Sequence, residues 1–339
     1  MYTYLPGREK GNININNESM MINNKDILLS GKESYGMKIA ADFDLEKREP
    51  KLVKMDMAIY PEMINGADGV ITLRKNPDST KGDLADRADN STGMALMADE
   101  TVNGNVNFEP GKAVNKGKIK LQDNISNSLG MFINIGSNMT NQGEINVNAL
   151  AQKDDTGKYK PNVAMRADQV KKEHAIKKVK RIIEEEVNGR IRKKNIEVEK
   201  NVVFDTAVIN DTAGKINING QAGIAMFAQG KVEETGTAQA INKGTITIDE
   251  NTETEEAKKS KANFGMFSAK EAQVTNESDG KIFVKNSEDS VGMVSLVEGT
   301  GETAKVSKSE NKGIIEASGE RTTAVYNSGE FLMDNENAS

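Results

Sequence analysis

The sequence contains no cysteine and only one histidine, His174, among its 339 residues. Without thiols, the chain can form neither disulfide bonds nor thiolate metal sites, and a single imidazole cannot supply a site that needs two. A Ser-His-Asp triad would depend on the same histidine, which lies in a highly charged stretch, so we do not expect one. The composition therefore argues against zinc, redox and serine-nucleophile chemistry.

Tryptophan is also absent, aromatic residues make up only 4 % of the chain, and no run of 18 apolar residues occurs. The sequence therefore offers no candidate for a membrane-spanning helix. With a sequence pI of about 5.3 and few rings to stack on bases, nucleic acid is not an expected partner. The first six residues lack the basic and apolar segments of a secretory signal peptide, and repeats begin almost at once. We therefore expect an internal piece of a longer protein.

What the sequence does contain is a repeated phrase, Asn-x-Gly-x-Ile-x-(Ile/Leu/Val). Its copies begin at Asn115, Asn141 and Asn242, with looser copies at Asn65, Asn210 and Asn276. The looser copies place three residues between Asn and Gly instead of one. A difference of two preserves the in/out alternation of a strand, whereas a one-residue slip would reverse it. Self-similarity of this kind indicates a repeat fold.

A second phrase, Gly-Met, follows the first in nearly every repeat. Its copies lie at 36–37, 93–94, 130–131, 265–266 and 292–293, with Ala-Met at 164–165 and 225–226. Seven of the sixteen methionines lie in these phrases. We therefore assign the high methionine content to core packing, without a metal or redox role.

Each repeat consists of three short segments in which apolar and polar residues alternate, as in 117–121. A period of two indicates strands, and the apolar side of one unit is uncovered until another unit stacks on it. We predict an all-β fold, a right-handed parallel β-helix with three-strand coils, forming a single solenoid over 1–339. About eight coils would give a rod roughly 40 Å long. The aligned asparagines are expected to form a stacked amide ladder.

Irregular intervals between the repeats predict insertions at about 38–65, 150–205 and 229–239, with a further loop at 76–91. One stretch, 166–200, carries apolar residues at helical spacing and predicts a helix that ends at Asn188-Gly189. The apolar positions are Ile176, Val179, Ile183 and Val187.

This stretch, 166–200, also holds 12 Lys and Arg against 7 Asp and Glu. One interpretation is a cationic arm that binds an anionic glycan or lipid surface. The other is an insertion helix that lies on the solenoid with its lysines in solvent. Glu184-Glu185-Glu186 dilutes the basic face and favours the second interpretation.

Few residues qualify as chemical sites. Asp154-Asp155 and Asp42-x-Asp44 pair carboxylates, but neither has the spacing of an EF-hand or a calcium-binding nonapeptide repeat, so we interpret them as loop acids. There is no P-loop and no dinucleotide-binding glycine motif. Among 51 acidic residues, no pair can be singled out for glycoside cleavage. We predict no catalytic, cofactor-binding or metal-binding residue and no cofactor.

The combination of Asn-x-Gly-x-Ile-x-Val with Asn/Asp-Ser-x-Gly-Met resembles the passenger repeats of large type V autotransporter adhesins of the fusobacterial type. The segments 127–131 and 289–293 show it best, and the resemblance covers most of the chain except about 40–64 and 150–205. It implies a β-helical stalk exposed at the cell surface and anchored in the outer membrane by a C-terminal translocator barrel. The signal peptide and the barrel are both absent from this sequence.

Two classes of function follow. The first is a non-catalytic passenger segment that acts as a stalk, an adhesin or both, and that recognises a host or bacterial cell-surface glycan or protein through loops between coils. The second is a polysaccharide lyase or hydrolase, because parallel β-helices also carry such enzymes. A column of Asp, Arg or Lys along one outer face would favour the enzyme. The outward positions of the repeats show no such column, and we therefore expect no enzyme.

Overall fold

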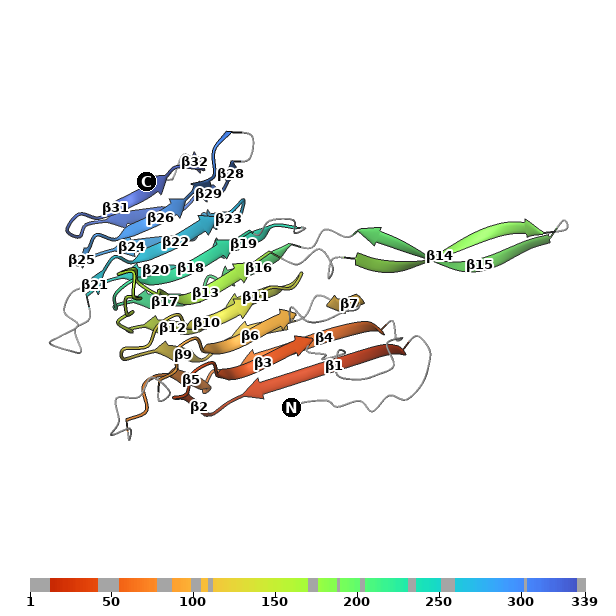
Figure 1. Cartoon of the computed structure of the whole chain (residues 1–339), viewed down its shortest axis with the longest axis horizontal. Coiled ribbons are helices and arrows are strands. Elements are labelled where there is room, and N and C mark those ends of the chain that lie inside the picture. The colour runs from red at the N-terminus through yellow and green to blue at the C-terminus, as the bar shows by residue number, and fades with distance from the viewer. Residues whose placement is uncertain are drawn as a thin grey trace.

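The computed structural model shows eight stacked coils of three strands each, followed by one further strand (Figure 1). It describes residues 13–41, 55–77, 87–98, 105–108, 112–169, 176–187, 190–201, 205–230, 236–250, 260–301 and 304–333. The strands of successive coils pair in parallel and in register, so that three sheets run along the rod. The prediction of a right-handed parallel β-helix is confirmed.

The three sheets take one strand from each coil in turn. Sheet A contains β1 (Ile13–Asn23), β4 (Met55–Asn65), β8 (Lys112–Asn115), β11 (Asn138–Asn141), β16 (Thr206–Asn210), β19 (Ala238–Asn242), β23 (Gln273–Asn276), β29 (Lys308–Asn311) and β32 (Glu330–Met333), and β7 (Asn105–Phe108) also pairs with β4. Sheet B contains β2 (Asp26–Leu29), β5 (Val70–Leu73), β9 (Lys118–Leu121), β12 (Glu144–Val147), β17 (Lys215–Ile218), β20 (Thr245–Ile248), β24 (Lys281–Val284) and β30 (Ile314–Ala317). Sheet C contains β3 (Tyr35–Ala41), β6 (Thr92–Ala98), β10 (Leu129–Ile133), β13 (Asn162–Asp168), β18 (Gly223–Gln229), β22 (Phe264–Ala269), β26 (Val291–Ser295) and β31 (Thr323–Asn327).

The core is a set of columns in which like residues stack from coil to coil. Ile119, Ile145 and Ile216 are register partners in sheet B, and all three are fully buried. Burying one such side chain stabilises the fold by roughly 1.5–3 kcal/mol. The methionines of the Gly-Met phrases form a similar buried column in sheet C, at 37, 94, 131, 165, 226, 266 and 293. Their assignment to core packing is therefore confirmed.

The glycine before each methionine lies where two coils approach closely. A Cβ atom added to Gly130 would lie 2.5 Å from the carbonyl oxygen of Ala164 in the next coil, and one added to Gly93 would lie 2.7 Å from that of Gly130. Alanine takes the same position at 164 and 225, so some coils accept a methyl group there. No repeat places a larger side chain at this point, because the backbone of the neighbouring coil occupies the space.

The asparagine ladder forms along one edge of the rod, where sheet A ends. The Nδ2 of each asparagine donates to the Oδ1 of its counterpart in the next coil at 2.7–2.8 Å. Its members are Asn23, Asn65, Asn115, Asn141, Asn210, Asn242, Asn276 and Asn311, all of them buried. Every bond points the same way along the rod, so each interior amide both donates and accepts. This confirms the predicted amide ladder.

The predicted helix at 166–200 is wrong. Its first part belongs to β13, and β14 (Ile176–Val187) pairs antiparallel with β15 (Arg190–Asn201) in a long two-stranded hairpin (Figure 1). The segment is rich in β-branched residues, which favour strands over helices. Val187 pairs with Arg190, so Asn188-Gly189 separates the two strands. Asn-Gly is the strongest short sequence signal for a two-residue hairpin turn, and it outweighs the helical spacing.

The predicted insertions are wider than the connections that the structure leaves outside the coils. Much of 38–65 belongs to β3 and β4, and 150–205 contains β13. Of 229–239, the first residue ends β18 and the last two begin β19. Among the residues that the structure describes, no helix is long and apolar enough to cross a membrane.

Candidate functional site

The rod has three corners, and one of them is uniformly tight. Every connection from sheet A to sheet B contains two or four residues. The ladder asparagine begins each of these turns and fixes it: the Nδ2 of Asn65, for example, donates to the carbonyl oxygen of Gly69 at 3.2 Å. The two-residue and four-residue turns correspond to the copies with one and with three residues between Asn and Gly. Because the two lengths differ by two, the following strand keeps the same residues facing inward. This corner leaves no room for a binding loop.

The other two corners carry all the long connections, and both border sheet C. Between sheets B and C, the longest connections are 74–91, 148–161 and 249–263. Between sheets C and A, they are 42–54, 99–111, 169–205 and 296–307. The last of these contains a short hairpin of β27 (Val297–Glu298) and β28 (Lys305–Val306). Because the long connections are confined to these two corners, sheet C is the sheet that has long connections at both of its edges.

The outer face of sheet C carries a row of aromatic residues. Phe132, Arg166, Phe227 and Phe267 are register partners in four consecutive coils, and all are partly exposed. The Arg166 guanidinium lies 5.9 Å from the ring centroid of Phe132 and 5.2 Å from that of Phe227. The rings of Phe227 and Phe267 meet edge to face at 5.4 Å, and Phe264 contacts Phe267 in the same way at 5.5 Å. We call these five residues the aromatic face.

Arg166 is held in place by polar partners at the edge of the aromatic face. Its Nε and an Nη atom donate to the carboxylate of Asp168 at 2.7 and 3.0 Å, and the same Nη donates to Gln229 at 2.8 Å. Asp168 is buried, so the bidentate pair is well shielded from solvent. The guanidinium is therefore fixed between two rings. A partner that contacts it would not have to restrict the conformation of the Arg166 side chain on binding.

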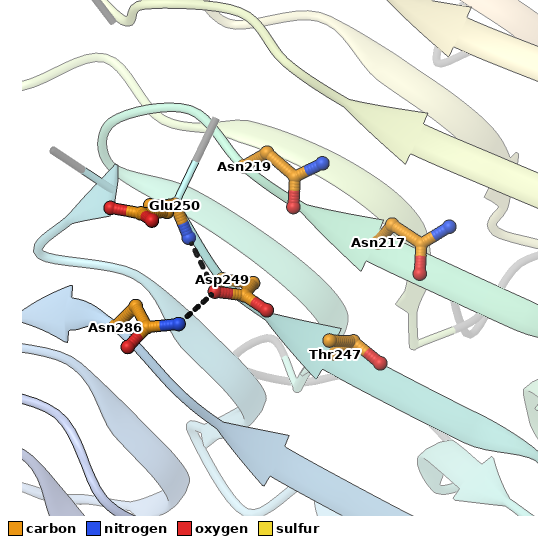
Figure 2. Close-up of a pocket in the computed structure, with 6 residues that line it drawn as sticks. All are labelled: Asn217, Asn219, Thr247, Asp249, Glu250 and Asn286. Carbon is orange, nitrogen blue, oxygen red and sulfur yellow. Dashed lines mark hydrogen bonds between the residues drawn. The ribbon is translucent and has the colours of Figure 1, made fainter. Parts of the chain in front are cut away.

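A hollow lies on the outer side of sheet B (Figure 2). It measures about 340 Å³ and is lined by Asn217, Asn219, Thr247, Asp249, Glu250 and Asn286. Much of its hydrogen-bonding capacity is used within the protein. Asp249 Oδ1 accepts from Asn286 Nδ2 at 3.0 Å and from the Glu250 backbone at 2.8 Å, as Figure 2 shows. The hollow is open and polar, and its two carboxylates are consecutive in sequence, so it offers no acid–base pair placed across a substrate.

A cluster of charged residues joins three coils at the corner between sheets B and C. The Arg321 side chain donates to Glu288 and, at 2.6 Å, to Asp289. Lys261 approaches the same carboxylates at 3.3 and 3.6 Å. The hydrogen bond from Arg321 is the main reason that the pKa of each carboxyl lies below its usual value. We interpret the cluster as an electrostatic clasp between coils.

The clasp predicts a pH dependence of stability. Its carboxyl pKa values are lower in the folded than in the unfolded chain, where values near 4.5 and 3.8 apply. Its contribution is therefore complete above about pH 4.5 and is lost as the pH falls through the folded values. We expect Arg321→Gln to lower the melting temperature at pH 7, and the difference from the wild type to shrink steadily below pH 4.5. Thermal melts from pH 7 to pH 2.5 measure this; a difference that stays constant would contradict it.

Of the carboxylate pairs noted in the sequence, Asp154-Asp155 lies within the described residues, where Asp154 is part of a turn. Asp154 Oδ1 accepts from the backbone of Thr156 and Lys158 at 2.9 and 3.0 Å and from the Thr156 hydroxyl at 2.7 Å. These bonds lower its pKa and identify it as a turn residue, with Asp155 beside it in the same loop. Asp42, Asp44 and His174 lie outside the described residues. Within the described part, no group of three His, Cys, Asp or Glu residues could hold a metal ion.

Sequence reasoning missed the aromatic face, although a signal was present. Phe132, Phe227 and Phe267 each follow the methionine of a repeat phrase directly. The chain has only nine phenylalanines. Because the methionine points into the core, the next residue along the strand must point outward.

Comparison with known families agrees with this geometry. A family model described as the BigA third pectate lyase-like domain matches residues 7–172 and 203–332. This chain belongs to that family. No curated protein and no solved structure matches it.

The match to the BigA third pectate lyase-like domain is interrupted at one place only, between residues 172 and 203. The β14–β15 hairpin, Ile176–Asn201, lies entirely within the unmatched segment. The coils on either side of it are matched. The hairpin is therefore an addition to the framework that defines the BigA-type domain.

Proposed function

We propose that this BigA-type domain is a non-catalytic segment of an exported autotransporter passenger and serves at the cell surface as both stalk and adhesive surface. The observation that carries the proposal is the difference between the three corners of the rod. One corner is locked by the asparagine ladder, and the other two bring their insertions to the borders of the aromatic face. A continuous ladder suits a stalk, and a partly exposed aromatic row suits a binding surface.

The proposed partner is a glycan or protein on a host or bacterial cell surface. Phe227 and Phe267 supply apolar contact area that is already ordered, and the paired guanidinium of Arg166 adds directed hydrogen-bond donors. Aromatic residues and arginine together are typical of surfaces that bind partners strongly. In the full-length protein, the C-terminal translocator barrel is a further proposed partner, for export.

The alternative is a polysaccharide lyase or hydrolase on the same scaffold. Hydrolysis of a glycosidic bond canonically uses two carboxyl groups that flank the bond. The acidic residue that lies beside the aromatic face, Asp168, is buried, and Arg166 already holds it in a bidentate pair. This arrangement supports a binding role over a catalytic one.

The experiment compares adhesion with catalysis in the same preparation. Purified 1–339 is incubated with cultured epithelial cells and with bacterial cells, and saturable binding is measured by flow cytometry. In parallel, acidic and neutral polysaccharides are incubated with the protein and assayed for new reducing ends and for unsaturated products. We expect saturable binding without cleavage. Turnover of any polysaccharide, abolished by substitution of an acidic residue, would overturn the proposal.

A further inference from the structure

The β14–β15 hairpin has no part in the stacked core or in the aromatic face. Its strands pair with each other from Ile176 with Asn201 to Val187 with Arg190, and with no strand of sheets A, B or C. Figure 1 shows the ribbon extending away from the rod. Two strands alone are marginally stable in water and bury little. Because the hairpin also lies outside the family match, a purpose other than folding must account for it.

The register of the hairpin separates its charges between two faces. Alternate positions of a strand share a face, and paired positions lie on the same face. One face, which we call the basic face, takes Lys177, Val179, Arg181, Ile183, Glu185, Val187, Arg190, Arg192, Lys194, Ile196, Val198 and Lys200. It has six basic residues and one acidic residue, a net charge of +5. The opposite face has three basic residues and four acidic ones, a net charge of −1.

The basic residues also extend along the whole ribbon. Each strand has 12 residues and spans about 40 Å, and successive rows on one face lie about 7 Å apart. Five of the six rows on the basic face contain Lys or Arg; the exception pairs Val179 with Val198. Such an array matches a ligand that carries negative charge at regular intervals along an extended chain. A compact anion would meet only one or two of these rows.

We propose that the basic face of the β14–β15 hairpin binds a linear anionic polysaccharide bearing sulfate or carboxylate groups. Arginine and lysine pair with both groups, and arginine does so through two parallel hydrogen bonds. The twist of the ribbon favours a flexible chain over an anionic membrane. Two-stranded ribbons twist strongly, as Figure 1 shows for this one, so a single face cannot lie flat on a planar bilayer along its length. A polysaccharide chain can follow the twist.

The test uses heparin as the probe and two triple substitutions with the same change in net charge. On the basic face, Arg181, Arg192 and Lys194 are changed to Gln; on the opposite face, Lys178, Lys180 and Lys193 are changed to Gln. Affinity of the full chain is measured by surface plasmon resonance from 50 to 300 mM NaCl. We expect wild-type binding that weakens with salt, at least about a tenfold loss for the basic-face triple, and a loss within about threefold for its counterpart.

Equal losses for the two triples would show that net charge alone attracts heparin, and would overturn the proposal. Absence of wild-type binding at 50 mM NaCl would also overturn it, as would binding to phosphatidylserine-containing vesicles without binding to heparin. Replacing 173–202 by a short Gly-Ser linker provides the folding control. We expect it to shift the melting temperature by less than about 3 °C while heparin binding is lost, because the segment lies outside the stacked core. The double variant Phe227→Ser/Phe267→Ser should still bind heparin, which separates this proposal from the aromatic face.

Discussion

Replacing Asn141 with alanine is expected to destabilise the rod by about 4 kcal/mol. Asn141 accepts from Asn115 at 2.8 Å and donates to Asn210 at 2.8 Å, and all three amides are buried. Alanine would leave a donor on one neighbour and an acceptor on the other without partners. Each unsatisfied buried polar group costs about 1–3 kcal/mol, and the cost is added to that of the lost bonds themselves. At roughly 2–4 °C per kcal/mol, the melting temperature should fall by about 10 °C.

The matched control for the ladder variant is Asn138→Ala. This asparagine begins the same strand, β11, but its side chain is exposed. Loss of an exposed amide should change the unfolding free energy by less than about 0.5 kcal/mol. Urea unfolding of the two variants beside the wild type provides the comparison. If the two substitutions had similar effects, the ladder would contribute nothing beyond ordinary strand pairing.

The second large effect is expected at the glycine of the same corner. A Cβ atom on Gly143 would lie 2.1 Å from the carbonyl oxygen of Gly117 and 2.7 Å from the carbonyl carbon of Lys116. Both are backbone atoms of the preceding coil, so they can move only if two coils separate. Gly143→Ala should therefore cost about 3 kcal/mol, near the upper end of the usual range for overpacking. Calorimetry should show a melting temperature roughly 6–12 °C below that of the wild type.

Gly31→Ala is the control for the glycine variant. The nearest atom to an added Cβ there is Ser34 Oγ at 3.5 Å, an ordinary contact distance. This substitution also restricts the unfolded chain, which stabilises the protein slightly or leaves it unchanged. A Gly143→Ala protein as stable as Gly31→Ala would mean that the coils are not packed as closely as the structure shows.

The sequence predicted the framework of the rod well, because every coil solves the same packing problem. The spacing of Asn141 and Gly143, repeated at Asn242 and Gly244, reports directly on one tight corner. Each coil needs a ladder asparagine, a glycine that lies against the backbone of the neighbouring coil, and two apolar residues that point into the core, all at fixed intervals. A requirement repeated in this way leaves a period in the sequence, and a period is readable without an alignment.

The hairpin could not be predicted in the same way, because it occurs once and its pattern is ambiguous. The spacing of Ile176, Val179 and Ile183 fits one apolar face of a helix, and it also fits a strand that carries apolar residues on both of its faces. Asn188-Gly189 is compatible with a helix end and with a hairpin turn. The pairing of two 12-residue strands decides between them, and pairing is not visible in one segment of sequence.

The aromatic face was missed for a different reason. The outward positions of the Asn-x-Gly-x-Ile strands, which show no column of charge, belong to sheet B. The informative positions lie in sheet C, one residue after the buried methionine, at Phe132, Phe227 and Phe267. Their neighbour in the row, Arg166, lies in the stretch that helical spacing had assigned to an insertion.

The most direct test of the proposed adhesive role compares the two outer faces of the rod. Phe227→Ser/Phe267→Ser removes two rings from the aromatic face, and Phe283→Ser removes a partly exposed ring from sheet B. Thermal melts first confirm that both variants fold. Flow cytometry then measures the saturable binding of 1–339 and of both variants to the cell type that binds the wild-type protein. We predict at least about a tenfold loss of affinity for the sheet C variant and no change for the sheet B variant. Equal binding by all three folded proteins would contradict the assignment of recognition to the aromatic face.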